Sequence, residues 1–289
     1  MIHERFILYS REGEKLRADL RYVPDGKPKP MILFLHGFKG FKDWGPFPAI
    51  LEEFAKSGFV TIAFNFSHNG VGDDLLNFTE LDRFEHNTFT RELEEVADVL
   101  LSIASLNGIP IDKSEIDCDN IGLLGHSRGA AMAILAGGHS KSVHAVAALS
   151  PVSTFERYSQ RQKEKWRAER VFTVRNQRTL QIMRLDVGLL DDLEAHRDRL
   201  DILKAAHSLP SLGKPLLLIV GSEDITTPRK EAEAIVEAAK GDYTELHIIP
   251  NTGHTFGAEH PYKGMTAPLT QVLQLSKSFF ERYLGPGFR

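Results

Sequence analysis

Cysteine is almost absent from this sequence. Of the 289 residues only Cys118 is a cysteine, so no disulfide can form within the chain. The first ten residues, MIHERFILYS, carry charged side chains where a secretory signal peptide needs an uninterrupted apolar stretch. Both observations favour a cytoplasmic location.

Long hydrophobic runs and an excess of one charge are missing as well. Runs such as LLLIV at 216–220 are far shorter than the roughly 20 residues that cross a bilayer. The 35 Lys and Arg residues nearly balance the 39 Asp and Glu residues, which leaves a formal charge of -4. We therefore expect neither a membrane nor a nucleic acid as partner. Because no histidine pair has a metal-binding spacing such as H-E-x-x-H, we also expect no metal and no cofactor.

Short apolar runs are what the chain does contain. They alternate with helical patterns and are MILFLHG, FVTIAFN, IGLLGHS, VHAVAALS, PLLLIVGS and ELHIIPN. Runs that are apolar on both faces and separated by helices predict a mostly parallel sheet with helices on both sides. Two earlier segments, RFILYS and LRADLRYV, predict an antiparallel pair. We expect an α/β fold that forms one domain over 1–289, with the oligomeric state, a homodimer included, left open.

Two helices are predicted by apolar residues at steps of three and four. The first has an apolar face of Phe89, Leu93, Val96, Ala97, Leu100, Leu101 and Ala104 and places on its opposite face Arg91, Glu92, Glu94, Glu95 and Asp98. The second follows the same pattern over 269–283 near the end of the chain. We expect both apolar faces to pack against the sheet.

About sixty residues between ALSPVS and GKPLLLIV are too many for an ordinary connection between strands. We interpret 151–210 as an inserted helical cap. Its first part is basic and has aromatic residues interleaved, which is a pattern also found in nucleic-acid-binding segments. A solvated basic helix face with its aromatics packed inward is the simpler interpretation.

Ser127 lies in the stretch IGLLGHSRGAAMA, between an apolar run and a run of small residues. This is the strand, sharp turn and helix that a nucleophile elbow requires. Side chains at 125 and 129 would collide across such a turn, and both positions are glycine, Gly125 and Gly129. A chance glycine turn explains the pentapeptide equally well when it is taken alone.

A serine nucleophile needs a base and a group that orients the base, in the chain order Ser, acid, His. GSEDITTP places Asp224 after one strand, and NTGHTFG places His254 after the next. We predict these three residues as the catalytic set. Glu223 is the alternative acid, because a loop shifted by one residue would bring it to the same place.

Three other histidines compete with His254 for the role of base, and each has a simpler interpretation. His247 alternates with apolar residues and is expected on the sheet, His260 is expected to anchor a loop, and His126 is expected to be packed inside the elbow.

Backbone N-H groups should meet the oxyanion of a tetrahedral intermediate. We expect one donor from Arg128, directly after the serine, and the other from Phe38 in ILFLHGFKGF, where Gly37 lets the backbone turn inward. His36 is expected to stabilise this loop by hydrogen bonding. The segment FNFSHNGVGDD, 65–74, is either a pocket wall or a turn-rich connection.

Taken together, HGF at 36–38, GHSRG at 125–129, GSEDITTP at 221–228 and GHTFG at 253–257 resemble the α/β-hydrolase superfamily. Within it the chain is most similar to the bacterial dienelactone-hydrolase and feruloyl-esterase-like group, over about 6–284. One departure is Arg128, because Gln often follows the nucleophile in feruloyl-esterase-like members. If the Arg128 side chain reaches the pocket, an anionic substrate is favoured.

The resemblance implies a serine hydrolase that cleaves a small carboxylic ester through an acyl-enzyme. It implies Ser127 as nucleophile, His254 as base, Asp224 as its orienter, and the N-H groups of Phe38 and Arg128 as oxyanion donors. Two alternatives stay open: a thioesterase or small-peptide hydrolase with the same triad, and a catalytically silent binding protein with a hydrolase fold.

Overall fold

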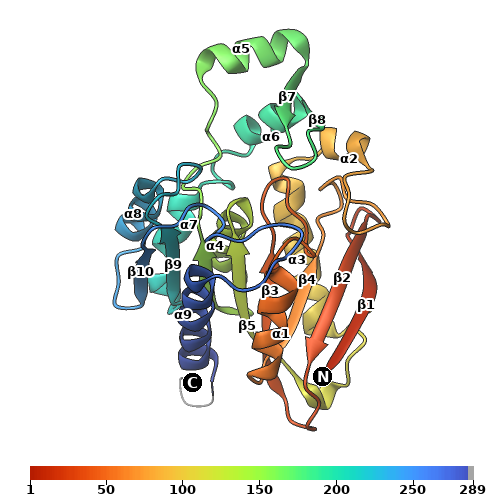
Figure 1. Cartoon of the computed structure of the whole chain (residues 1–289), viewed down its shortest axis with the longest axis vertical. Helices are drawn as coiled ribbons and strands as arrows, with labels where there is room; N and C mark the ends of the chain where they lie inside the picture. The colour runs from red at the N-terminus through yellow and green to blue at the C-terminus, as the bar shows by residue number, and fades with distance from the viewer. Residues whose placement is uncertain (286–289) are drawn as a thin grey trace.

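Eight strands form one central sheet in the computed structural model, which describes residues 1–285. Their order across the sheet is β1-β2-β4-β3-β5-β6-β9-β10 (Figure 1). The strands are β1 (Ile2–Tyr9), β2 (Lys15–Tyr22), β3 (Lys29–Leu35), β4 (Val60–Phe64), β5 (Ile116–His126), β6 (Val143–Leu149), β9 (Leu216–Gly221) and β10 (Thr244–Ile249).

The sheet is parallel from β4 to β10 and antiparallel at its other edge. β1 pairs with β2, and β2 with β4, in antiparallel fashion, whereas β3 is parallel to both β4 and β5. The pairs β5–β6, β6–β9 and β9–β10 are parallel too. The mostly parallel sheet and the N-terminal antiparallel pair are therefore confirmed.

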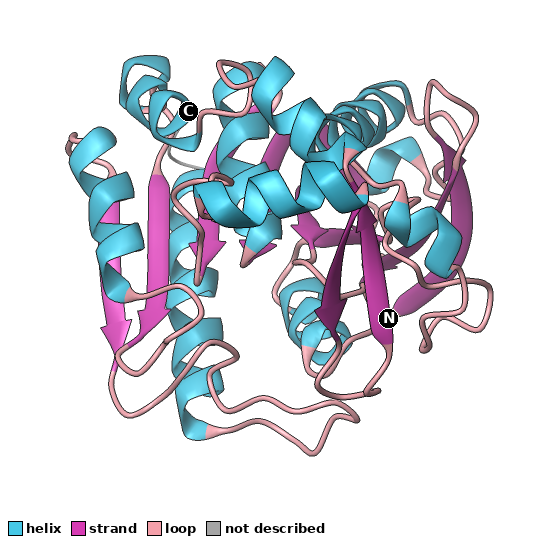
Figure 2. Ribbon diagram, turned by 90° about the horizontal axis from the view of Figure 1, so that it is seen from above, coloured by secondary structure: helices cyan, strands magenta, loops and turns pink. Residues whose placement is uncertain are grey.

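Helices cover both faces of the sheet (Figure 2). In β3, Met31, Leu33 and Leu35 belong to one apolar core, while Ile32 and Phe34 belong to the other. This alternation follows from the two-residue period of a strand. One core is closed by α1 (Phe47–Lys56) and α9 (Ala267–Leu284), and the other by α3 (Phe89–Ser105), α4 (Arg128–His139) and α8 (Arg229–Ala238). The remaining short elements before residue 150 are α2 (Leu81–Glu85) and the 3-10 turn η1 (Lys113–Glu115).

Segment 151–210 contains a hairpin as well as helices. Its elements are α5 (Gln160–Glu169), β7 (Val171–Arg175), β8 (Ile182–Asp186), α6 (Gly188–Ala195) and α7 (Ile202–Ser208), with the 3-10 turn η2 (Pro210–Leu212) at its end. The elements α5 to α6 lie beyond the carboxyl ends of the parallel strands (Figure 1). By contrast, α7 packs against α4 and α8. The antiparallel pair β7–β8 was not predicted from the sequence.

Trp166 holds this segment together. Its side chain is fully buried, its indole N-H donates to the Leu185 carbonyl at 3.0 Å, and its ring contacts those of Tyr158 and Phe172. The interleaved aromatic residues thus pack inward. Exposed Arg167, on the same helix, pairs with Asp191 and Glu194.

The predicted charged face of α3 is wrong in part. Glu92, Glu95 and Asp98 are buried, whereas Leu101, placed on the apolar face, is 64% exposed. The carboxylates are buried because other segments cover that side of the helix: Asp98, for instance, accepts from the backbone N-H and the Nε-H of Arg11, both at 2.8 Å. Among the helices of residues 1–285, none has the length and apolar character needed to span a bilayer.

Candidate active site

Ser127 lies at the turn between β5 and α4 with φ 58° and ψ -120°. This conformation costs a non-glycine residue on the order of 1–3 kcal/mol, so the surrounding structure must impose it. A Cβ atom on Gly125 would lie 2.3 Å from the carbonyl oxygen of Gly129, and one on Gly129 would lie 2.2 Å from that of Leu35. Both positions therefore require glycine. At Gly129, however, the collision is with the end of β3 and not with residue 125.

Ser127, His254 and Asp224 form one chain of hydrogen bonds. The Ser127 Oγ lies 3.0 Å from the His254 Nε2, and the His254 Nδ1 lies 2.8 Å from the Asp224 Oδ2. Ser127 follows β5, Asp224 follows β9 and His254 follows β10, so all three stand at the carboxyl ends of parallel strands. The structure brings together the three residues that the sequence analysis selected.

Asp224 is buried and accepts three hydrogen bonds from its own loop in addition to the one from His254. Its Oδ1 accepts the backbone N-H groups of Thr226 and Thr227, both at 2.9 Å, and its Oδ2 accepts the Thr227 hydroxyl at 2.8 Å. Although burial opposes ionisation, these bonds and the one from His254 hold the pKa of Asp224 well below its ordinary value. The alternative acid, Glu223, is exposed. Thr227 was missed by the sequence analysis.

The other three candidate histidines have the structural roles that the sequence analysis expected of them. The buried His126 contacts the His254 backbone carbonyl through Nε2 at 3.0 Å, and burial lowers its pKa to about 3. His247 lies on β10, and the Nδ1 of His260 accepts the N-H of Gly45 at 2.9 Å. In residues 1–285, no group of three or more His, Cys, Asp or Glu side chains is arranged to hold a metal ion.

The loop after β3 runs beside the elbow. A Cβ atom on Gly37 would lie 2.9 Å from the Ser127 Cβ and 3.5 Å from the Arg128 nitrogen, so the two backbones are in contact. Among the described residues, neither the N-H of Phe38 nor that of Arg128 has a protein acceptor. Arg128 is the first residue of α4, where N-H groups have no partner within the helix. Two free N-H groups therefore flank Ser127.

Sequence comparison identifies the family. A model of the alpha/beta hydrolase family matches residues 32–267, which contain the elbow and the loops of Asp224 and His254. The chain belongs to the alpha/beta hydrolase family. No curated protein matches its sequence significantly.

Solved structures of other hydrolases have the same fold as this alpha/beta hydrolase. The alpha/beta hydrolase GrgF from Penicillium sp. sh18 is 16% identical with a TM-score of 0.73, over 99% of this chain and 100% of that one. The esterase domain of a Rhodothermus marinus protein is 17% identical with a TM-score of 0.64, over 99% and 100%. A putative dienelactone hydrolase from Klebsiella pneumoniae subsp. pneumoniae is 14% identical with a TM-score of 0.62, over 98% and 99%.

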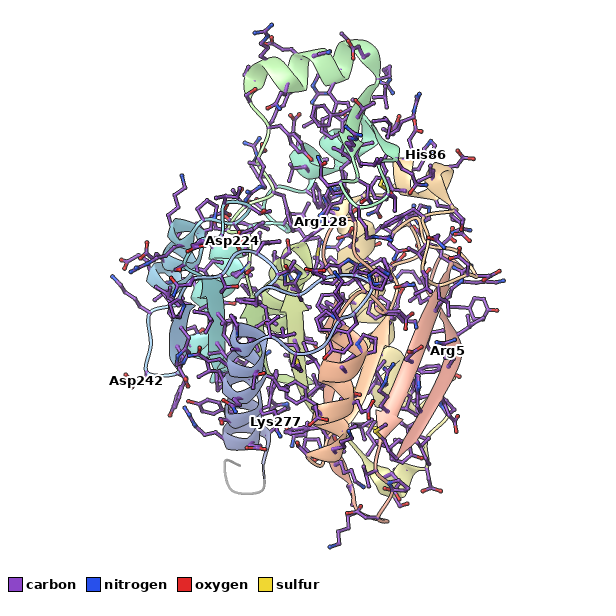
Figure 3. All side chains as sticks on the ribbon, viewed as in Figure 1. Arg5, His86, Arg128, Asp224, Asp242 and Lys277 are labelled. Carbon is purple, nitrogen blue, oxygen red and sulfur yellow. The ribbon has the colours of Figure 1, made fainter. Side chains whose placement is uncertain are left out.

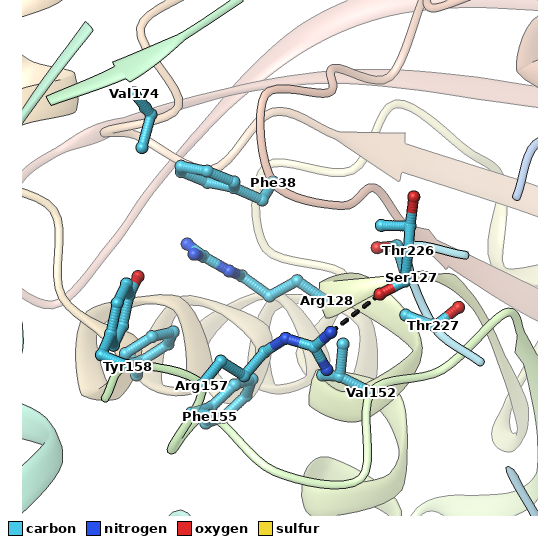
Figure 4. A pocket seen from close by; sticks show the side chains of 11 residues that line it. Phe38, Ser127, Arg128, Val152, Phe155, Arg157, Tyr158, Val174, Thr226 and Thr227 are labelled. Atoms are coloured by element: carbon cyan, nitrogen blue, oxygen red, sulfur yellow. Dashed lines mark hydrogen bonds between the residues drawn. The ribbon is translucent and has the colours of Figure 1, made fainter. Parts of the chain in front are cut away.

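A cavity of about 260 Å³ opens onto Ser127 in this hydrolase (Figure 4). Its apolar walls come from the loop after β3, from α3 and from segment 151–210, and consist of Phe38, Phe89, Val152, Phe155, Tyr158 and Val174. Its polar lining consists of Arg128, Arg157, Thr226 and Thr227 in addition to the serine. Apart from Ser127, most of these residues belong to no motif. Sequence reasoning identified only Phe38 and Arg128 among them as part of the site. Figure 3 shows Arg128 and Asp224 at the end of the sheet that lies beneath the elements α5 to α6.

The segment 65–74 supports the loop after β3 and does not line the cavity. The buried His36 contacts the Gly37 carbonyl through Nδ1 at 3.0 Å, and its Nε2 accepts the N-H of Phe66 at 3.3 Å. These bonds assign the proton to Nδ1, and burial lowers the pKa of His36 to about 4, so the ring is neutral. Asn69 donates to the Gly40 carbonyl at 3.3 Å. His36 thus stabilises the loop as expected.

Glu95 lies behind this segment and predicts how the stability of the hydrolase depends on pH. Its carboxylate accepts the backbone N-H of Ser67 at 3.0 Å and also the Ser67 hydroxyl, and burial raises its pKa to about 7. Because the native state then binds this proton more tightly than the unfolded state, the contribution of Glu95 to stability is fully present below its unfolded pKa and is lost as pH rises through 7. We expect this contribution to fall by roughly 3 kcal/mol between pH 5 and pH 9, measured as the difference between wild type and Glu95→Gln in urea unfolding.

Glu95→Gln should flatten this pH dependence, since a glutamine can accept from the Ser67 N-H and donate to its hydroxyl without titrating. Glu94→Gln, one residue away on α3 and paired with Arg199, is the matched control and should keep the wild-type slope. An unchanged slope in Glu95→Gln would show that another group titrates.

Proposed function

We propose that this protein is a serine hydrolase that cleaves carboxylic esters through an acyl-enzyme. The observation that supports the proposal best is the chain of hydrogen bonds from Ser127 through His254 to Asp224, together with the mainly apolar cavity that Ser127 lines. Structures named as esterases among those with the same fold agree with it. An apolar pocket with a few polar groups is typical of small-molecule sites.

In the acylation step, the Ser127 Oγ attacks the ester carbonyl while its proton passes to the His254 Nε2. The negative charge that develops on the carbonyl oxygen is met by the N-H groups of Phe38 and Arg128. Asp224 keeps the other proton of the ring on Nδ1 and stabilises the imidazolium. Collapse of the intermediate breaks the ester bond, and the imidazolium returns its proton to the leaving alkoxide, which departs as the alcohol.

In the deacylation step, water replaces the alcohol. His254 takes a proton from the water, whose oxygen attacks the acyl carbonyl, and the second tetrahedral intermediate collapses with the proton returned to the Ser127 Oγ. The products are the free serine and a carboxylic acid. The same residues therefore serve both halves of the cycle.

Two measurements on the wild-type protein test the proposal. A fluorophosphonate should label Ser127, located by peptide mass spectrometry, and p-nitrophenyl esters from acetyl to long-chain acyl, together with an aryl acrylate ester, should be hydrolysed. Parallel rates on an ester, its thioester and its amide report which bond the site prefers; a faster thioester would replace the esterase proposal with a thioesterase. Absence of both labelling and turnover would instead favour a silent binding protein.

A further inference from the structure

The side chain of Arg128 crosses the cavity, away from Ser127, toward Tyr158 (Figure 4). It is nine-tenths buried, and its guanidinium lies 4.2 Å from the centroid of the Phe38 ring and 4.8 Å from that of Phe89. Both rings are also part of the cavity wall. The guanidinium is therefore held in place by aromatic rings, and a ligand reaches it at its N-H edge.

Most of the N-H groups on that edge have no partner. The Nη1 of Arg128 donates to the Glu92 Oε1 at 3.2 Å, and the described residues supply no acceptor for its Nε-H or for its Nη2. Both nitrogens are accessible at the surface of the cavity, because neither is one of the unpaired polar atoms that are fully enclosed within residues 1–285. A guanidinium with free N-H groups in an apolar cavity is a site for an anion.

Arg157, the other arginine of the cavity, is already engaged. Its Nη2 donates to the Thr226 carbonyl at 2.7 Å (Figure 4). Its Nη1 pairs with Glu231. The same Glu231 accepts the backbone N-H of Ser153 at 2.8 Å. Arg157 thus links the start of segment 151–210 to the loop that carries Asp224. It provides a control, because it has the same charge in the same cavity but few free donors.

We propose that the preferred ester carries a carboxylate that binds Arg128, so that the substrate is a half-ester of a dicarboxylic acid. This inference rests on the proposed ester hydrolysis. A carboxylate matches the planar N-H edge of a guanidinium and accepts two parallel hydrogen bonds from it. The apolar walls between Arg128 and Ser127 would contact the methylene chain that joins the carboxylate to the scissile carbonyl. Neutral esters can enter the cavity but leave the Arg128 donors unpaired.

Glu92 is the charge that a bound carboxylate would meet. It is buried, accepts from Asn87 at 2.6 Å through the same Oε1 that faces Arg128, and leaves its Oε2 without a partner in the described chain. Burial raises the pKa of Glu92. Arg128 is therefore joined to Glu92 by one hydrogen bond of 3.2 Å, and its remaining donors face the cavity.

The first experiment compares isosteric substrates. Monomethyl succinate, glutarate and adipate are each assayed beside the methyl ester of the corresponding mono-amide, which has the same shape without the charge. For at least one chain length, kcat/KM for the half-ester should exceed that of the amide about tenfold or more, as expected for hydrogen bonds between charged groups. The matching free dicarboxylate should inhibit hydrolysis of p-nitrophenyl acetate, and its diamide should not.

Variants assign the preference to one arginine. Arg128→Gln should bring the ratio of kcat/KM for the half-ester to kcat/KM for the amide close to one. Arg128→Lys should leave an intermediate value of this ratio, and Arg157→Gln should keep the wild-type value. Thermal unfolding identifies any variant that fails to fold, and inhibition of the wild type by the dicarboxylates then decides without variants. The inference would be overturned if the half-ester and the amide ester were hydrolysed at equal rates and the dicarboxylate and the diamide inhibited equally. It would also be overturned if the preference for the half-ester were lost in Arg157→Gln and kept in Arg128→Gln.

The two proposals fail in different ways. If p-nitrophenyl acetate is hydrolysed and the charged substrates have no advantage, ester hydrolysis stands and the carboxylate site is wrong. If no ester is hydrolysed and the fluorophosphonate leaves Ser127 unlabelled, the proposed function itself is wrong.

Discussion

Ser127→Ala should lower kcat for p-nitrophenyl ester hydrolysis by about five to six orders of magnitude. Removal of the hydroxyl leaves His254 without the group that it deprotonates, although the two flanking N-H groups and the cavity remain. Loss of a serine nucleophile costs about this much in a well-studied serine protease. Stopped assays with burst analysis on wild type and variant would measure it.

The fold should survive this change, because alanine and serine have the same restrictions at the φ of 58° that the elbow imposes. Thermal unfolding and circular dichroism check that point. Ser140→Ala is the matched control. Ser140 is the C-cap of the same helix α4, and within residues 1–285 its hydroxyl bonds only with that of Ser142, so this variant should be as active as the wild type. Residual activity of Ser127→Ala above a hundredth of wild type would mean that another residue is the nucleophile.

Asp224→Asn should lower kcat by about four orders of magnitude. Two backbone N-H groups point at the Oδ1 position, so the asparagine must place its carbonyl oxygen there and its NH2 group toward His254. An NH2 group cannot accept the proton on Nδ1. The ring would therefore carry its proton on Nε2, facing Ser127, and could not act as base.

The pH-rate profile of Asp224→Asn tests this reasoning further, because hydroxide can replace part of the missing base and the remaining activity should rise with pH. Glu223→Gln serves as its control, since Glu223 is exposed on the same loop and should be replaceable without loss. A larger loss in Glu223→Gln than in Asp224→Asn would assign the role of acid to Glu223.

The strands and the three residues of the hydrogen-bonded chain were predictable because each has a local cause. A buried parallel strand is a short apolar run, and parallel strands place the residues that follow them at one edge of the sheet. Gly125 and Gly129 likewise follow from the tight turn at Ser127, although the atoms that exclude a Cβ at Gly129 belong to β3 and are visible only in three dimensions.

The buried carboxylates of α3 and the walls of the cavity were not predictable in this way. Periodicity separates apolar from charged positions, but it does not reveal that another segment covers the charged side and supplies partners such as Arg128 for Glu92. The β7–β8 hairpin has a similar cause. Its strands are five residues long and partly exposed, and neither has the continuous apolar run that identified the strands of the central sheet.

The order of the strands has a consequence for the protein during its synthesis. Ser127 and His254 are 127 residues apart, and β10, which precedes the histidine, is added at the edge of the sheet beyond β9. At about 5–20 residues per second, a ribosome needs roughly 6–25 s to pass from one to the other. Throughout that interval the nascent chain carries the proposed nucleophile without its proposed base. It can therefore carry out the proposed chemistry only after the last strand has docked.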